Sequence, residues 1–336
     1  MHRLDWSWAL SLALLAVASI GCRPAAVARS GSASGSSIAA PRLSGKAGAT
    51  PPAWPVYSLS AEQTWQLNLP AGQRFDASGL TLLPDGGLLT VSDRGPTVYR
   101  LQFRDGSDEV DLDPLPNAFT EAQLARFRRQ KIDRYDAEGL AVDELGRVYL
   151  CEEANRWVLR WDPRRDVVER LEIDWTPVRL FFSTTDRNAS WEGIAVAGDK
   201  LYLANERRFG RIVVVDLATL KVIDHFAPRS QGSNSQDTHY SDLCWFDGAL
   251  YVLLRTSQCV LRVDPGTKRV LAEYRYAAVE KAPGAAYRTL YPHGFMEGLA
   301  VDATHVWLVT DNNGFGRVAD RADRRPTLFR CRRPDA

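Results

Sequence analysis

The sequence predicts an all-β fold, a β-propeller, from three observations. Five segments of the chain align with one another, and each holds short apolar runs separated by a turn that contains Asp or Gly. Equivalent positions in successive segments are 50 to 60 residues apart, which is close to the length of a four-stranded propeller blade. The apolar runs are only about 4–8 residues long and rich in Val, Leu, Tyr and Trp, which argues against a helical solenoid, the competing repeat architecture.

The aligned segments supply the strands in chain order. They begin at Asp76, Asp136, Ala189, Tyr240 and Phe295. Three of them are followed by a further run with the pattern of an outer strand, VVERLEI, KVIDHFA or RVLAEYRY. Five segments favour five blades. Six blades are the alternative, because the interval from Asp105 to Arg134 is long enough to contain additional strands.

The last segment shows no outer strand before the chain reaches TLFRC. The stretch TWQLNLP (Thr64–Pro70) is expected to add this strand and to close the ring, which removes an exposed sheet edge. The propeller domain then covers residues 57–333. Within it, TEAQLARFRRQKIDR (Thr120–Arg134) is predicted to be a helix capped by Thr120, with Leu124 and Phe127 on one face.

The start of the chain has the pattern of a bacterial export signal, predicted for residues 1–22. Basic MHR precedes an apolar run of 15 residues, too short to span a bilayer comfortably, and Gly21-Cys22 follows. This ending resembles a lipoprotein signal, in which Cys22 is lipidated; plain secretion is the alternative. Residues 23–56, rich in Ser, Gly, Ala and Pro, predict a disordered tether. We therefore expect an exported protein, in the periplasm or at the cell surface, anchored to the outer membrane.

Composition limits the remaining classes. A chain of 336 residues with 45% hydrophobic residues can bury a large core. Its 42 basic and 41 acidic residues give no basic excess, so no nucleic-acid partner is expected, and we expect a monomer. Four cysteines besides Cys22 show no C-x-x-C spacing. An exported protein could pair Cys244 with Cys259, although buried free thiols suit predicted strands equally well.

Acidic residues stand at the strand ends of nearly every segment. In a propeller blade the innermost strand lies antiparallel to the second, so the start of one meets the end of the other at one mouth of the central channel. The starts of the first strands carry Ser78, Glu138, Glu192, Asp242 and Glu297. The ends of the second strands carry Asp93, Glu153, Glu206, Arg255 and Asp311. The sequence thus predicts eight carboxylates and one guanidinium around one mouth.

Such crowding predicts a cation. A single acid at a strand end is usually solvated or caps a turn, but two carboxylates about 5 Å apart repel by about 3 kcal/mol at an effective dielectric constant near 20. The group must therefore hold extra protons or bind a positive ion. Oxygen donors in irregular geometry suit Ca²⁺ better than Mg²⁺, and Asn205 and Asn312 could add neutral ligands. We expect calcium at this mouth.

Other residues leave two interpretations open. Arg255 could form an internal ion pair, or it could bind a phosphate or carboxylate beside the cation. His239 and His293 are expected to be surface loop residues, with a catalytic role as the alternative. The aromatic residues before the third segment could form a packed plug or a ligand wall; these are Trp175, Phe181, Phe182 and Trp191.

The repeated EGLAVD, followed by VYLCEE or LYLANE, is similar to two related groups of exported bacterial propellers. One is the phytase-like family, also called "esterase-like activity of phytase", and the other is the SdiA-regulated family, whose propellers are five-bladed and bind calcium. The resemblance covers roughly residues 56–332. It implies calcium ligands at Glu138, Glu153, Glu192, Glu206, Glu297 and Asp311, whereas Ser78, Asp242 and Arg255 depart from the expected acids.

Two functions follow from these patterns. In the first, the protein is a metal-assisted phosphoester or carboxylester hydrolase, in which Glu192 or Glu297 activates water and Arg255 holds the substrate anion. The chain contains no G-x-S-x-G motif that would indicate a serine nucleophile. In the second, it is a non-catalytic surface lipoprotein with a structural calcium, which binds a ligand or protein through its loops.

Overall fold

The computed structural model describes residues 54–69, 72–127, 135–182, 189–206, 210–231, 238–289 and 294–335, all within a compact unit that begins at Pro52. The predicted export signal and Cys22 lie outside these residues, as do all but the last three residues of the predicted tether. In the part of the chain that is described, no helix is both long enough and apolar enough to cross a bilayer.

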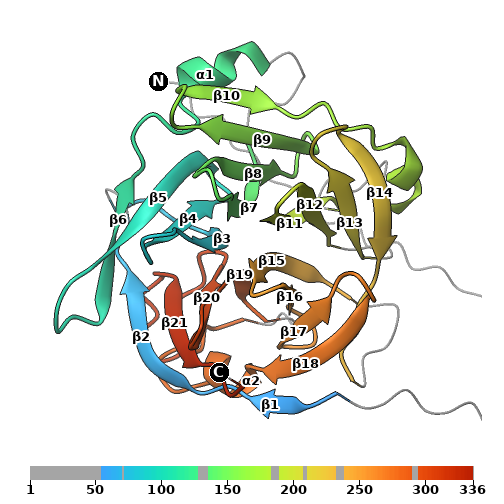
Figure 1. Cartoon of the computed structure of the whole chain (residues 1–336). Coiled ribbons are helices and arrows are strands. Elements are labelled where there is room, and N and C mark those ends of the chain that lie inside the picture. Colours follow the sequence, from blue (N-terminus) through green and yellow to red (C-terminus); the bar gives the residue numbers. More distant parts are fainter. Residues whose placement is uncertain are drawn as a thin grey trace, which may run out of the picture. The chain divides into compact units, whose positions relative to one another are not determined.

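The described strands form antiparallel four-stranded units arranged around a centre (Figure 1). The first unit contains β3 (Ala77–Leu82), β4 (Leu88–Ser92), β5 (Gly95–Phe103) and β6 (Glu109–Pro114). The next contains β7 (Ala137–Val142), β8 (Val148–Glu152), β9 (Trp157–Asp162) and β10 (Val167–Arg170). After it come β11 (Trp191–Ala197), β12 (Lys200–Asn205), β13 (Arg211–Asp216) and β14 (Lys221–Phe226).

Two further units complete the arrangement. One contains β15 (Tyr240–Phe246), β16 (Ala249–Leu254), β17 (Cys259–Asp264) and β18 (Arg269–Arg275), and short β1 (Val56–Ser58) pairs parallel with β18. The other contains β19 (Met296–Val301), β20 (His305–Thr310) and β21 (Thr327–Arg332). The innermost strands contact one another in a cycle, β3, β7, β11, β15, β19 and again β3, so the ring is closed.

An N-terminal strand completes the last unit. Strand β2 (Ala61–Leu67) pairs antiparallel with β21, with Trp65 opposite Leu328. Its end also pairs in parallel with β6, which joins the last unit to the first in one eight-stranded sheet. The predicted β-propeller closed by an N-terminal strand is therefore confirmed. The described part of the interval from Asp105 to Arg134 supplies β6 as the outer strand of the first unit.

The predicted helix is present in its described part. Helix α1 (Glu121–Leu124) continues as a 3₁₀ turn (Ala125–Phe127), and Thr120 caps it through a reciprocal bond with Gln123. Leu124 is buried against the first two units. The predicted remainder, 128–134, lies outside the described residues. Two further short helices are α2 (Ala277–Glu280) and a 3₁₀ helix (Thr176–Phe181).

The core lies between neighbouring sheets, which explains why the strands are apolar on both faces. Large aromatic side chains such as Tyr149, Trp191 and Tyr251 are fully buried there. The four described cysteines are free thiols, three of them buried, so the structure favours free thiols over a disulfide between Cys244 and Cys259.

Candidate functional site

A bulge fixes the position of the first acidic column. Near the start of every innermost strand, the pairing with the second strand skips one residue, which lets its side chain project from the ladder. The skipped residues are Ser78, Glu138, Glu192, Ser241 and Glu297. Four of these were predicted to share a column, and the structure places them in equivalent positions.

Asp242 corrects the sequence alignment by one residue. Its place in the register corresponds to the glycine that follows the bulge in the other units, and Ser241 takes the place of the acid. A Cβ atom on Gly193 would lie 2.5 Å from the Cα atom of Asp242, so backbones meet closely here. The prediction that Asp242 belongs to the acidic column failed because its segment lacks the glycine that marks the bulge elsewhere.

Asp242 ties the innermost strands together instead. Its Oδ2 atom accepts hydrogen bonds from the backbone N–H of Leu299 at 2.7 Å and of Leu80 at 3.3 Å, while Oδ1 accepts from Leu243 at 2.8 Å. The side chain is fully buried, and this burial raises its pKa well above the ordinary value, against the effect of the amide donors. We therefore leave Asp242 out of the proposed metal site.

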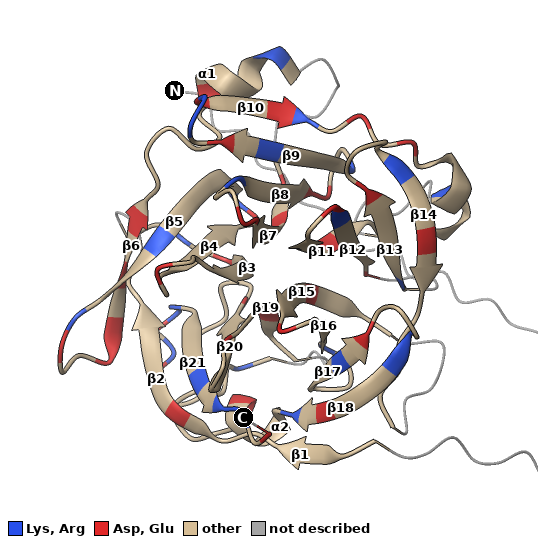
Figure 2. Cartoon of the chain, in the orientation of Figure 1, with Lys and Arg blue, Asp and Glu red and all other residues tan. Residues whose placement is uncertain are grey.

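The second column lies where the sequence placed it. The backbone N–H at the end of each second strand donates to the carbonyl two residues before the bulged residue of the same unit. These pairs are Asp93 with Asp76, Glu153 with Asp136, Glu206 with Ser190, Arg255 with His239, and Asp311 with Phe295. The two columns and the residues that precede the first therefore share one mouth of the ring. Figure 2 shows acidic residues at inner strand ends, while the outer strands carry both acidic and basic residues.

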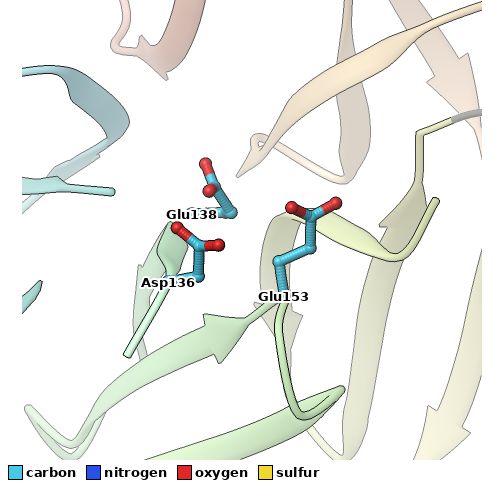
Figure 3. A group of neighbouring side chains, drawn as sticks. All are labelled: Asp136, Glu138 and Glu153. Carbon is cyan, nitrogen blue, oxygen red and sulfur yellow. The ribbon is translucent and has the colours of Figure 1, made fainter. Parts of the chain in front are cut away.

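Carboxylates from two adjacent units converge at this mouth. Oxygens of Asp136, Glu138 and Glu153 lie within 4.8 Å of one another, and Figure 3 shows the three side chains at the ends of β7 and β8. Oxygens of Glu153, Glu192 and Glu206 satisfy the same limit, so Glu153 is common to both groups. The structure thus brings together four of the predicted metal ligands and adds Asp136.

The ionised forms of Glu138 and Glu192 are disfavoured by burial and by the neighbouring carboxylates. Burial, followed by the charges of Glu153 and Asp136, raises the pKa of Glu138 well above its ordinary value. Burial, Glu206 and Glu153 do the same to the pKa of Glu192. Among described residues, neither Glu138 nor Glu192 forms a salt bridge. Bound protons or a cation beside Glu138 and Glu192 would relieve this repulsion.

Arg255 contacts one member of this group and one carboxylate outside it. Its Nη2 atom lies 2.7 Å from Oε1 of Glu206, and its Nη1 atom contacts Oε1 of Glu297. This geometry corresponds to the internal ion pair considered from the sequence. The Nδ1 atom of His239 lies 3.1 Å from the same Glu206 oxygen, and only 14% of its side chain is exposed. The expectation that His239 is a surface loop residue was wrong, because its side chain lies in the mouth beside Glu206. His293 lies outside the described residues.

A third group of acids has its own arginines. Asp76 is fully buried and is held by Nε of Arg74 at 2.7 Å and Nε of Arg94 at 2.9 Å. Asp93 and Asp311 are close enough to Asp76 for their charges to interact. Burial and then the charge of Asp76 raise the pKa of Asp311 to about 7. The charges of Asp93 and Asp311 also help to raise the pKa of Glu138, so this third group adjoins the group around Glu153.

The two predicted neutral ligands, Asn205 and Asn312, lie next to the second column. Asn205 is fully buried and occupies the position of Ser92 and Glu152, whose side chains accept backbone N–H bonds in their own units. Among described residues neither side-chain atom of Asn205 has a hydrogen-bond partner. Asn312 uses its amide group to bond the carbonyls of Phe315 and Arg324.

The aromatic residues before the third unit pack as a plug. Ring centroids of Trp175 and Phe182 lie 4.7 and 4.9 Å from that of Trp191, which is fully buried beside Glu192. Phe181 is also buried in the same core cluster. Of the two interpretations, the structure favours the plug.

Sequence reasoning missed Asp76, Asp136, Arg74 and Arg94. The signal for the two aspartates was present, since DASGL and DAEGL share an Asp two residues before the bulge. The contacts of Arg74 and Arg94 with Asp76 could not be predicted, because each arginine reaches Asp76 from a loop whose path depends on the folded ring.

Comparisons with known proteins agree with this fold. The family model described as "Esterase-like activity of phytase" matches residues 73–314. Glutaminyl cyclase from Myxococcus xanthus superposes with a TM-score of 0.55 at 14% identity, over 83% of this chain and 98% of its own. At that identity the likeness shows the fold alone. No curated protein matches the chain.

Other solved structures are more distant. An aldose sugar dehydrogenase from Streptomyces coelicolor gives a TM-score of 0.44 at 13% identity, over 81% of this chain and 98% of its own. Virginiamycin B lyase from Staphylococcus aureus gives 0.39 at 13% identity, over 80% and 73%. These similarities are too low to support any argument about the site.

Proposed function

This chain belongs to the phytase-like family, "esterase-like activity of phytase", and from that premise we propose that it is a calcium-dependent hydrolase of phosphoesters or carboxylesters, acting at the carboxylate mouth. One observation supports this most strongly. Carboxylates from two units converge within 4.8 Å around Glu153, and those of Glu138 and Glu192 form no salt bridge to a described residue.

The donor set fits calcium. All side chains in the two groups offer carboxylate oxygens, the ligands that hard divalent cations prefer, and none offers sulfur. Five carboxylates from four strand ends and one preceding loop can adopt the irregular coordination that Ca²⁺ tolerates and Mg²⁺ does not. Asp136, Glu138, Glu153, Glu192 and Glu206 would hold the ion. When bound, calcium would polarise a phosphoryl or acyl oxygen.

Glu192 is the proposed general base. Burial and the charges of Glu206 and Glu153 raise its pKa, which makes this carboxylate a stronger proton acceptor than an ordinary one. Its carboxylate would take the proton from water as the water oxygen attacks phosphorus or the acyl carbon, and would return that proton to the departing alkoxide. Trp191 and its aromatic neighbours fix the strand start from which Glu192 projects.

Glu297 and Arg255 have supporting roles in this proposal. Arg255 bridges Glu206 and Glu297, so Glu297 is less suited than Glu192 to act as a base. The contact of Arg255 with Glu206 fixes the Glu206 carboxylate beside Glu153 and Glu192. A substrate anion would have to compete with two carboxylates for Arg255, and we therefore assign this arginine to positioning rather than to substrate binding.

The test is an ester screen with purified protein. Metal content is measured first, and phosphate and carboxylate esters are then assayed with added calcium and with EDTA. We expect turnover that EDTA abolishes and that Glu192→Gln lowers by at least a hundredfold, with folding intact by circular dichroism. Undetectable metal together with a melting temperature that EDTA does not change would refute the calcium site.

One observation supports the non-catalytic alternative. The converging carboxylates come from two neighbouring units, β7–β8 and β11–β12, so a cation there would also join those units mechanically. If calcium is only structural, Glu192→Gln will lower the melting temperature and the calcium dependence, and no ester in the screen will be turned over.

Export remains part of the proposal. The signal-like start and Cys22 support a lipid-anchored protein at the periplasmic or surface side of the outer membrane. Cells that make the full chain should incorporate labelled palmitate into it, and Cys22→Ser should abolish this incorporation. A chain that stays in the cytoplasm would refute the proposal.

A further inference from the structure

A cavity opens at the mouth of the ring opposite the carboxylates. Its volume is about 390 Å³, and its lining residues are all described. Each innermost strand contributes a residue at or near its C-terminal end; these are Leu82, Val142, Val196, Phe246 and Val301. The carboxylates stand at the other ends of the same strands. The cavity and the carboxylate mouth are therefore separate sites.

The floor of this cavity lies close to Asp242. Leu243 and Ile194, which line the cavity, directly follow Asp242 and Gly193. Because Asp242 bonds the backbones of Leu80 and Leu299 across the ring, the channel is crossed at this level. The backbones that meet at Gly193 leave no room even for a Cβ atom. A molecule that enters from this side stays at this end of the ring.

The chemistry of the lining is apolar. Its two buried or half-buried aspartates are already used by protein donors: Asp143 by Arg147 and Tyr149, and Asp302 by Thr304 and Trp307. No lining residue carries a buried side-chain polar atom that lacks a partner among the described residues. A ligand would find largely apolar walls, no lining Lys or Arg, and the exposed carboxylate of Glu144, so an anionic group would lose its hydration without compensation.

We propose that this cavity binds a small, uncharged, apolar molecule, such as one with an aromatic ring or a short acyl chain. The volume lies in the range of small-molecule pockets, and burying an apolar group in such a site is favourable because it removes apolar surface from water. The wall includes the partly exposed side chains of Cys244 and Trp245. The proposal does not depend on calcium or on catalysis at the other mouth.

The experiment uses the full chain and N-phenyl-1-naphthylamine, an uncharged aromatic probe that fluoresces in apolar surroundings. Cys244→Phe and Thr81→Phe each add a ring to the wall, and Cys244→Ser is the control that keeps the volume. Glu192→Gln is the control at the other mouth. We expect saturable binding to one site, weakened at least tenfold by both Phe variants and changed less than twofold by both controls and by EDTA.

Two results would overturn the proposal. The first is that no saturable binding occurs, or that binding survives in a folded Phe variant; if one Phe variant fails to fold, the other decides. The second is that binding of the probe changes with protein concentration in step with dimer formation seen by light scattering. That result would assign the cavity to contact with a second copy of the chain.

Discussion

Single residues at the carboxylate mouth divide into three groups with different compensation. Arg74 and Arg94 balance Asp76, Arg255 balances Glu206 and Glu297, and the group around Glu153 has Glu138 and Glu192 without a described salt bridge. The sequence predicted the crowding, because strand ends meet in any propeller blade. It could not predict the division, because the carboxylate that each arginine reaches depends on the folded path of the segment that carries it.

The misplacement of Asp242 shows where sequence reasoning stops. Its segment, YSDLCW, offers an acid one position after the bulge, and only the backbone pairing shows that Ser241 is the bulged residue. A shift of one residue in a strand places the side chain on the opposite face of the sheet. Here it moves a predicted metal ligand into the centre of the ring.

Asp242 also supports a prediction about stability. Asp242→Asn replaces one of two acceptor oxygens by a donor group that faces backbone N–H groups, so unfolding free energy should fall by about 2–3 kcal/mol. The measurement is urea unfolding in the presence of calcium. Asp247→Asn, in the exposed turn of the same hairpin, should change stability by less than about 0.5 kcal/mol. Equal stability of the two variants would show that Asp242 does not tie the strands.

At the scale of elements, most strands could be predicted from the sequence, but the β-bulges that orient the acidic side chains could not. The runs VVERLEI, KVIDHFA and RVLAEYRY contain β10, β14 and β18, and each of these strands pairs antiparallel with the third strand of its unit. The pattern of apolar residues does not indicate the bulges. In four units the bulged residue is followed by a glycine, which lies so close to a neighbouring strand that a side chain would not fit.

This close approach can be tested with Gly193→Ala. The added Cβ atom would lie 2.5 Å from the Cα atom of Asp242, and backbone cannot move aside as a side chain can. We expect a loss of about 1–3 kcal/mol in the free energy of unfolding. Gly95→Ala is the matched control, since nothing lies within 4 Å of its added Cβ. If the two variants melt at the same temperature, the innermost strands are not packed as closely as described.

At the scale of the whole molecule, the ring explains how acids from distant segments come to share one charge environment. Closure by β2 and β21 follows from the missing outer strand of the last segment, which the sequence made visible. The depth of burial at the mouth was not visible, since any strand-end acid could equally face solvent. This burial makes stability depend on pH.

The raised pKa values of Glu152 and Asp311 indicate how stability changes with pH. Burial raises the pKa of both to about 7, from ordinary values of 4.5 and 3.8. Between those limits the unfolded chain has lost protons that the folded chain keeps, so stability falls as pH rises through this window, by up to about 1.4 kcal/mol per pH unit for each group. Below the lower limit both states are protonated, and above pH 7 the loss is complete.

The measurement is the melting temperature at pH 5, 6, 7 and 8. In EDTA we expect the highest value near pH 5 and a steady decline to pH 8. With calcium the melting temperature should be higher at every pH, because the ion binds the folded chain and not the unfolded one. A melting temperature that rises with pH in EDTA would contradict the raised pKa values.

The most direct test of the account is a calcium titration by calorimetry at pH 7.5. The wild-type chain should bind calcium, and Glu153→Gln, which alters the carboxylate common to both groups, should weaken this binding at least tenfold. Glu144→Gln makes the same charge change at the opposite mouth and should leave the affinity unchanged. Equal calcium affinity in both variants, or no binding to the wild-type chain, would contradict the claim that the converging carboxylates form a cation site.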